Sequence, residues 1–275
     1  MSTNLTEPAY WDNFWKSPFG TSASWLSHYY WLLSRRLTTY SRPGARAIEL
    51  GCGGSVWLPT LARKGVESWG IDYSDIGVAR TKEVLAHWRA DATVVRGDVF
   101  DAAVLPAAHF DLVYSMGLLE HFTDNRPYVD RLWDLAKPGG YVLTTVPNLG
   151  GHWGTLQKAL DQRVFDMHRI YTLAELDQAH LARGFRIVEA AQFFGGVYPL
   201  SVDYSVLLRR LPALAGRLFI GGIWATQQLV GWSTAVLPQA LRNPPKLAGH
   251  ILGVYQKPAG ASDAASAPPS STPPP

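Results

Sequence analysis

The stretch Ala47-Ile-Glu-Leu-Gly-Cys-Gly-Gly-Ser55 decides the fold of this chain. It predicts a buried strand that ends in an acidic residue and a glycine turn and then opens into a helix. Gly51 and Gly53 have no Cβ, so a ligand can lie directly against their backbone. Glu49 stands just before the turn, where its carboxylate can receive a cationic or hydroxyl-bearing ligand and would repel a phosphate. The stretch therefore favours a nucleoside with a positive group over a diphosphate.

The dinucleotide-binding fingerprint G-x-G-x-x-G does not fit this turn. Its third glycine packs the helix against the strand. Val56 stands at that position here. A glycine pair after a strand is weak evidence by itself, so the rest of the chain has to decide the ligand.

Composition narrows the classes of function. The chain has 275 residues, of which 47% are hydrophobic, as expected for one large domain or a domain with an insert. The net charge is +3 and no dense Lys/Arg run occurs, so we expect no nucleic-acid partner. Cys52 is the only cysteine, which excludes an internal disulfide and indicates a reducing, cytoplasmic compartment. The polar N-terminus does not resemble a secretory signal.

Strands and helices alternate through the middle of the chain. A helix with one apolar face is predicted over residues 22–40, and Pro43-Gly44 ends it. After it we predict strands at 46–51, 68–72, 93–97, 110–115, 140–146 and 185–194, and helices at 55–64, 75–88, 127–136 and 172–183. This β-α alternation indicates a mostly parallel sheet with helices on both faces. Ligands of such sheets lie at the carboxyl ends of the strands.

Residues 196–249 differ from the rest because they are apolar and contain one acid, Asp203. The uncharged run 218–241 is long enough to suggest a membrane-spanning helix. Gln227, Gln228 and Pro238 interrupt it, and the strand predicted at 250–256 must return to the same sheet. The segment is therefore expected to roof the substrate pocket, to form a dimer surface, or to lie as a basic patch on an anionic membrane. From residue 258 onward the chain is rich in Ala, Ser and Pro, which predicts a disordered tail.

Two further carboxylates follow the second and third strands. Asp72 comes 21 residues after Gly51, where an acid accepts hydrogen bonds from both ribose hydroxyls. Asp98 lies in Val94-Val-Arg-Gly-Asp-Val99 and can accept the exocyclic amine of adenine. The fourth strand ends in Ser115-Met-Gly-Leu-Leu-Glu-His-Phe122, which faces the same edge of the sheet.

With these motifs in order, the chain resembles the class I S-adenosylmethionine-dependent methyltransferases from about Arg46 to Phe194. The landmarks are ELGCGGS, GIDYSD, VVRGDVFD, FDLVYSMGLLEHF and LAKPGGYVLTTVPN. The look-alikes include small-molecule enzymes of the ubiquinone-biosynthesis type and bacterial relatives thought to act on lipids or glycans. The resemblance implies a Rossmann-like, doubly wound α/β sheet of seven strands in the order 3-2-1-4-5-7-6, with strand 7 antiparallel. The chain then divides into an aromatic lid and helix (1–42), a core (43–195), a helical cap insert (196–249), a last strand (250–257) and a tail (258–275).

The resemblance also assigns S-adenosylmethionine as the cofactor and names the residues that would hold it. The turn residues would hold its methionine part. Asp72 would bind the ribose and Tyr73 would pack on the adenine. The loops after the third and fourth strands would contact the adenine ring and line the floor of the cofactor pocket. The expected cofactor residues are Glu49, Gly51, Cys52, Gly53, Asp72, Tyr73, Asp98, Val99, Ser115 and Met116. Cys52 itself is expected to act mainly as a small apolar filler in the turn.

Methyl transfer requires the nucleophile, the methyl group and the sulfur to lie nearly in line, so positioning supplies much of the rate. A hydroxyl nucleophile also benefits from a base, and histidine is the usual one. His121 and His168 compete for this role. Glu120 is expected to orient one of them or, as the resemblance to ubiquinone-type enzymes implies, to help hold a divalent ion. The alternative is that Glu120 and His121 simply cap a helix. No metal site is expected, because no cluster with ligand spacing is visible.

Aromatic residues near the N-terminus are expected on the substrate side. Tyr10, Trp11 and Trp15 can form a lid that shields the sulfonium by cation–π contact, or can pack the first helix on the sheet. His152, flanked by glycines, is expected in a mobile loop near the substrate.

The sequence thus predicts methyl transfer to a small or amphiphilic acceptor such as a lipid, a glycan or a secondary metabolite, with O-methylation favoured. A non-catalytic cofactor-binding scaffold or sensor, a C-methyltransferase and a nicotinamide-dependent reductase are the alternatives. The oligomeric state is open.

Overall fold

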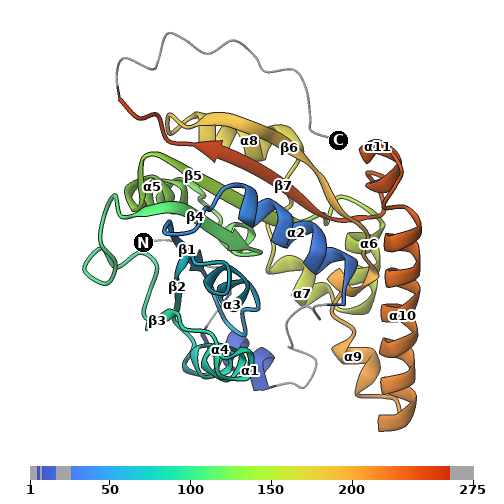
Figure 1. The fold of residues 1–275 in the computed structure, drawn as a ribbon. Coiled ribbons are helices and arrows are strands. Elements are labelled where there is room, and N and C mark those ends of the chain that lie inside the picture. The colour runs from blue at the N-terminus through green and yellow to red at the C-terminus, as the bar shows by residue number, and fades with distance from the viewer. Residues whose placement is uncertain (1–4, 7, 17–25, 261–275) are drawn as a thin grey trace.

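A computed structural model describes residues 5–6, 8–16 and 26–260 of the chain (Figure 1). The first part of the helix predicted over 22–40 and nearly all of the predicted tail fall outside these residues.

A seven-stranded mixed sheet forms the centre of the protein. Its strands are β1 (Arg46–Leu50), β2 (Glu67–Asp72), β3 (Thr93–Arg96), β4 (Phe110–Met116), β5 (Ala136–Pro147), β6 (Arg186–Val197) and β7 (Ala248–Gln256). Their order is β3-β2-β1-β4-β5-β7-β6, and β7 runs antiparallel to both β5 and β6. The predicted strand order and the antiparallel last strand are confirmed.

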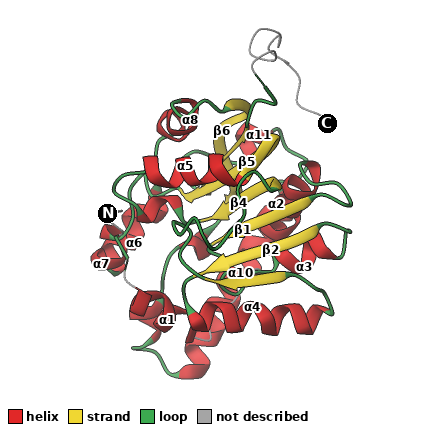
Figure 2. Ribbon diagram, turned by 90° about the vertical axis from the view of Figure 1, so that its left-hand side faces the viewer, coloured by secondary structure: helices red, strands yellow, loops and turns green. Residues whose placement is uncertain are grey.

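Helices cover both faces of the sheet (Figure 2). On one face, α5 (Arg126–Leu135) and α8 (Leu173–Leu181) pack against strand residues such as Ile48 and Val113. On the other face, α2 (His28–Thr39), α3 (Trp57–Ala62) and α4 (Asp75–Trp88) pack against residues such as Ala47 and Leu112. Adjacent strand residues belong to opposite cores because side chains alternate across a strand.

A serine cap positions the helix that follows β2. Ser74 precedes α4 in extended conformation, and its hydroxyl accepts a hydrogen bond from the Gly77 amide at 3.0 Å. This cap satisfies one of the free amides at the start of the helix. It also fixes the chain at the end of β2, where Asp72 projects.

The segment after β5 is helical, in contrast to the mobile loop predicted around His152. His152 is the first residue of α6 (His152–Leu160), and α7 (Gln162–Asp166) follows. The glycines that suggested a loop have a packing role instead, because a Cβ on Gly154 would overlap the Leu149 carbonyl. The Trp153 indole also donates a hydrogen bond to the Leu247 carbonyl at 2.6 Å, which ties α6 to the chain before β7.

The insert between β6 and β7 is largely helical, as predicted. It contains α9 (Ser205–Leu208), the long α10 (Ala213–Ser233) and α11 (Gln239–Arg242). In Figure 1, α10 stands at the right-hand edge of the molecule. Within the described ranges, no helix combines the length and hydropathy needed to cross a membrane, in agreement with the sequence argument for 218–241.

Candidate active site

A cavity of about 590 Å³ lies where β1, β2, β3 and β4 end at their carboxyl sides. This volume is within the range typical of small-molecule sites. Ten of the residues predicted for the site line it: Glu49, Gly51, Gly53, Asp72, Tyr73, Asp98, Val99, Met116, Trp11 and Trp15. The order of strands brings these separate segments to one edge of the sheet.

The turn after β1 needs glycine for two different reasons. Gly51 has a φ of +73°, which side chains with a Cβ disfavour. Gly53 makes a close approach, because a Cβ there would overlap the indole of Trp15. The open face expected at Gly53 is therefore covered by an aromatic side chain in this structure.

Asp72 is held in place by the backbone. Its carboxylate accepts hydrogen bonds from the amides of Gly53 and Ser74, both at 2.8 Å. Burial raises the pKa of Asp72, and the two amide hydrogen bonds oppose that rise. Each carboxylate oxygen can accept more than one hydrogen bond, so capacity remains for ribose hydroxyls.

Glu49 is a buried carboxyl group on the cavity wall. Burial raises its pKa to about 8, although a hydrogen bond from the Ser55 hydroxyl acts in the opposite direction. The group therefore carries its proton at neutral pH when no ligand is bound. A cationic ammonium beside it would favour the ionised form.

The far end of the cavity has aromatic walls and an exposed acid. Asp98 accepts a hydrogen bond from the Phe100 amide at 3.0 Å, which turns the chain back toward the cavity. Phe100 and Phe122 both line the cavity and meet edge to face with centroids 5.2 Å apart. These two residues were not predicted, although Phe100 follows Asp98 closely and Phe122 ends the quoted Glu-His motif. Such walls suit a flat aromatic base.

Helix α1 (Pro8–Lys16) covers this cavity with Trp11, Phe14 and Trp15. It is anchored to α4, because the Ser74 hydroxyl donates to the Asp12 carboxylate at 2.6 Å. The two roles considered for the N-terminal aromatics coincide at Trp15, which packs on the glycine turn and lines the cavity.

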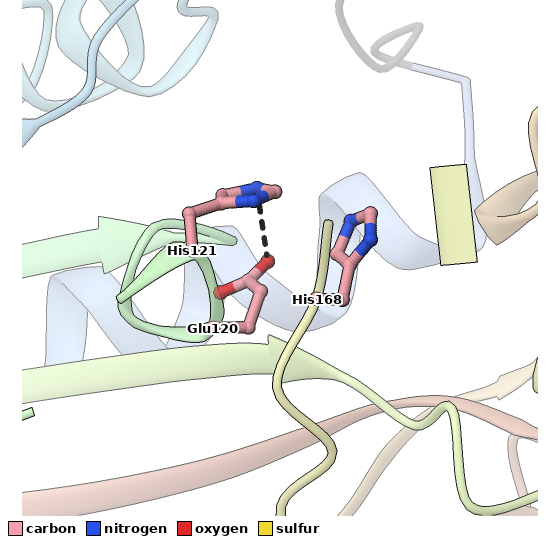
Figure 3. Close-up of side chains that lie close together, drawn as sticks. All are labelled: Glu120, His121 and His168. Carbon is pink, nitrogen blue, oxygen red and sulfur yellow. Dashed lines mark ion pairs between the residues drawn. The ribbon is translucent and has the colours of Figure 1, made fainter. Parts of the chain in front are cut away.

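Glu120, His121 and His168 lie together beside the cavity (Figure 3). One ligand atom from each, a carboxylate oxygen and two imidazole nitrogens, all fall within 4.8 Å of one another. The two segments are joined by the Arg169 amide, which donates to the Glu120 carbonyl at 2.7 Å. All three residues were predicted as catalytic candidates, but their spacing along the chain does not show that they form one cluster, because His168 follows α7 in a distant part of the chain.

The hydrogen bonds of the two histidines define their tautomers. Nδ1 of His121 lies 2.9 Å from the Met167 carbonyl, and Nδ1 of His168 lies 2.6 Å from the Val164 carbonyl. A carbonyl only accepts, so each Nδ1 carries the proton and each Nε2 keeps its lone pair. These lone pairs can take a proton or bind a divalent metal.

Burial keeps the cluster uncharged at neutral pH. It lowers the pKa of His121 to about 3, lowers that of His168, and raises that of Glu120 to about 8. The 3.8 Å separation of His121 Nε2 and Glu120 Oε1 is therefore a contact between neutral groups rather than an ion pair. Oε2 of Glu120 is buried and has no hydrogen-bond partner among the described residues.

None of the three cluster residues lines the cavity itself. The Trp11 ring does line it and meets the His121 ring edge to face at 5.1 Å. On the other side, a Cβ on Gly117 would lie 3.1 Å from Glu120 Oε1. Trp11 and Gly117 thus connect the cavity to the cluster, because each lines the cavity and approaches a cluster residue.

Four other predicted residues also lie outside the cavity lining. Cys52 is fully buried in the core, with its Sγ against Gly70, and so fills space without facing a ligand. Ser115 is fully buried in β4. Tyr10 meets the edge of Trp11, and His152 is exposed at the start of α6.

Two tyrosines that the sequence analysis did not place in the site also line the cavity. Tyr29 of α2 and Tyr198, which follows β6, have ring centroids 4.8 Å apart and both line the cavity. Tyr29 is only 7% exposed, so it also packs in the core beside the cavity. Tyr198 lies in the insert, where no motif marks a functional position.

Residues 24–190 match the protein family described as "Methyltransferase domain". A Ubiquinone biosynthesis O-methyltransferase of Psychrobacter arcticus is 29% identical over 157 residues, which cover 52% of this chain and 59% of that protein. The protein of the same name from Methylococcus capsulatus is 33% identical over 111 residues, which cover 39% and 46%. The matched region thus spans about half of each of these relatives.

Solved structures share the fold at low identity. A SAM-dependent methyltransferase from Archaeoglobus fulgidus has a TM-score of 0.54 at 18% identity, over 81% of this chain and 90% of that one. The [4+2]-cyclase SpnF has a TM-score of 0.56 at 19% identity, over 83% and 80%. These similarities establish the fold, and the cyclase shows that the fold also serves other chemistry.

Proposed function

Because this chain belongs to the family of class I S-adenosylmethionine-dependent methyltransferases, we propose that it transfers a methyl group from S-adenosylmethionine to a hydroxyl oxygen of a small or amphiphilic acceptor. The observation that carries the proposal is the neutral cluster of Glu120, His121 and His168, whose imidazole nitrogens keep free lone pairs beside the cofactor cavity. A hydroxyl nucleophile needs such a proton acceptor more than a carbanion does.

The cavity residues fit this cofactor. Glu49, a buried acid with no cationic partner among the residues that the structure describes, would receive the ammonium of the methionine part. Asp72, oriented by two backbone amides, would accept the ribose hydroxyls, and Asp98 would accept the adenine amine. The bound cofactor supplies an electrophilic methyl group on a positively charged sulfur.

The residues around the cavity have three tasks in the transfer. They align the acceptor oxygen with the methyl carbon, keep water out, and take the hydroxyl proton as the new C–O bond forms and the C–S bond breaks. The aromatic side chains of α1 exclude water from one side. We assign the role of proton acceptor to Nε2 of His168, because this side chain is partly exposed. His121 is buried and its pKa is lowered to about 3. Glu120 and His121 are then positioning residues.

The character of the cavity supports an apolar or amphiphilic acceptor. Trp11, Phe14, Tyr29 and Tyr198 present aromatic surface to the space next to Glu49. The two curated relatives described above are named Ubiquinone biosynthesis O-methyltransferase. Helix α10 of the insert has exposed leucines, and the exposed Arg209, Arg210 and Arg217 lie before and within it, which suits an encounter with amphiphiles at a lipid surface.

A labelled-methyl assay tests the proposal. The purified chain is incubated with methyl-labelled cofactor and a panel of phenols, catechols and hydroxylated lipids, and products are identified by mass and by the NMR shift of the new methyl group. His168→Ala should lower turnover about 100-fold or more. Its affinity for S-adenosylhomocysteine should not change. His87→Ala, on the exposed side of α4, is the control.

The outcomes separate the alternatives. An unchanged turnover of His168→Ala would remove the histidine from the mechanism. Methyl groups on carbon would assign C-methylation, and cofactor binding without any product would favour a scaffold or sensor. Turnover that falls with EDTA and returns with a divalent metal would assign the cluster to a metal rather than to proton transfer.

A further inference from the structure

The exposed face of α10 is unusually apolar for a protein surface. Leu214, Leu218 and Leu229 are 69%, 68% and 72% exposed, and Trp232 at the end of the helix is 45% exposed. Exposed Val236 and Leu241 continue this surface to α11. Isolated exposed apolar side chains are common, but a contiguous row of them marks a binding surface. We call the row formed by these residues the α10 face.

The spacing of these residues makes the row continuous. Leu214, Leu218, Leu229 and Trp232 follow one another at helical intervals, so they lie on one side of α10. Gly221 and Gly222 fall between them, and a Cβ on either would meet only open space. The described part of the chain therefore leaves this side uncovered along the whole helix.

The opposite side of α10 is fixed to the core. Gln228 accepts a hydrogen bond from the His28 amide at 2.7 Å, and Gln227 accepts one from the Leu200 amide at 3.4 Å. Gly231 lets the helix approach the His28 ring so closely that a Cβ would overlap it. The apolar row therefore cannot turn inward, and its exposure is a property of the folded chain.

Positive charge surrounds the α10 face. From Tyr204 to Gly260 the sequence contains no acidic residue, while residues 204–247 contain Arg209, Arg210, Arg217, Arg242 and Lys246. The first three of these are exposed, and in the part of the chain that the structure describes none of the five forms a salt bridge.

A second basic and aromatic group lies at the end of α10 near Trp232. Trp31 of α2 meets Trp232 with ring centroids 5.6 Å apart, and the Arg35 guanidinium lies 5.0 Å from the Trp31 ring. The pKa of Arg242 is lowered by burial and by the nearby charges of Arg36 and Arg35. Tryptophan beside arginine is the combination found at the level of lipid headgroups.

We propose that the α10 face is a docking surface for an anionic lipid bilayer. The leucines and Trp232 would enter the boundary between headgroups and acyl chains, while the arginines bind lipid phosphates. Because α10 is too polar to cross a membrane and is held to the core by Gln227 and Gln228, the helix would lie along the surface. The inference goes beyond methyl transfer and does not depend on it.

Charge favours a bilayer over a second copy of the chain. A symmetric dimer places the same patch of both subunits face to face. Arg209, Arg210 and Arg217 would then lie in an interface to which neither copy's residues 204–260 contribute an acid that could neutralise them. An anionic bilayer instead supplies the opposite charge.

Vesicle binding of the full chain tests the proposal without cofactor. Sedimentation with phosphatidylcholine vesicles is compared with vesicles that also contain phosphatidylglycerol. We expect binding to the anionic vesicles, with loss of at least about tenfold in Leu218→Glu/Leu229→Glu. Arg209→Ala/Arg210→Ala/Arg217→Ala should weaken binding by roughly fivefold per arginine. Leu181→Glu, at a 46% exposed leucine of α8 outside the α10 face, should bind like the wild type.

Several outcomes would overturn the proposal. These are failure of the wild type to bind anionic vesicles, equal binding by the leucine variant, and a dimer in light scattering that Leu218→Glu/Leu229→Glu dissociates. Melting curves and S-adenosylhomocysteine binding of each variant show that it is folded. Weakening of wild-type binding by salt would support the role of the arginines.

Discussion

Asp72 and Glu120 are both buried carboxyl groups at the same edge of the sheet, yet their surroundings differ. Asp72 is held by two backbone amides, so its orientation is set before a ligand arrives. Glu120 has one buried oxygen without a partner among the described residues, and burial raises its pKa to about 8. The comparison indicates that the cofactor side is preformed, whereas the cluster side awaits a proton, a metal or an acceptor. Four experiments test this difference.

The largest effect is expected at Asp72. Asp72→Ala removes the acceptor for the ribose hydroxyls and leaves the Gly53 and Ser74 amides unpaired, so affinity for S-adenosylhomocysteine should fall about 100-fold or more. Glu120→Ala should leave that affinity unchanged. Isothermal titration calorimetry measures both, with Asp91→Ala on the exposed surface as control. Equal losses in the two variants would remove the distinction between the two sides.

The next effect concerns the contact between the lid and the glycine turn. Gly53→Ala should displace the Trp15 indole and weaken cofactor binding roughly tenfold, because overpacking of this kind costs about 1–3 kcal/mol. If the clash is with the lid, Trp15→Ala in the same chain should restore most of the affinity. Calorimetry on the single variants and the double variant gives the coupling between the two residues. A double variant as weak as Gly53→Ala would mean that the new methyl group meets the cofactor instead.

A smaller effect is expected from the protonation of Glu49. Its pKa is raised to about 8, so a proton must leave before the carboxylate can pair with the cofactor ammonium. Affinity for S-adenosylhomocysteine should therefore rise as the pH increases from 6 to 8, by up to about tenfold per pH unit, and level off above 8. Besides burial, the charge of Asp72 raises the pKa of this carboxyl group, while hydrogen bonds with Ser55 and Tyr114 lower it. Calorimetry in buffers of different ionisation enthalpy should also detect the released proton.

Glu49→Gln provides the control for this titration. Its affinity should be lower at pH 8 and independent of pH between 6 and 8. Persistence of the wild-type slope in this variant would assign the titration to Asp72, whose pKa is also raised by burial.

The meeting of Glu49, Asp72 and Asp98 at one cavity was predictable from sequence because each lies at or near the carboxyl end of a strand. Glu49, Asp72 and Asp98 each stand in or just after a segment whose apolar pattern predicts the strand, and parallel strands bring such ends together. The cluster side depends on the segment of α6 and α7, where glycines around His152 suggested a loop, and on contacts between distant segments. Glu120 and His168 were candidates from sequence, but no local pattern shows that both histidines meet Glu120 or that Tyr198 lines the cavity.

The smallest effect concerns the stability of the cluster. The pKa of Glu120 is about 8 in the folded chain and about 4.5 in its ordinary state, so the folded protein binds more protons between these values. Its contribution therefore makes the folded state less stable as the pH rises from 4.5 to 8. His121, with its pKa lowered to about 3, acts in the opposite direction below pH 6.5.

Replacing the carboxyl group isolates this contribution. Glu120→Gln cannot ionise, so its melting temperature relative to the wild type should rise between pH 6 and pH 8 by a few degrees, about 2–4 °C for each kcal/mol. All other titrating groups are shared by the two proteins and cancel in the difference. Scanning calorimetry at matched ionic strength measures it. Parallel curves would mean that Glu120 ionises as easily in the folded chain as in water, and the contrast with Asp72 would then lose its basis.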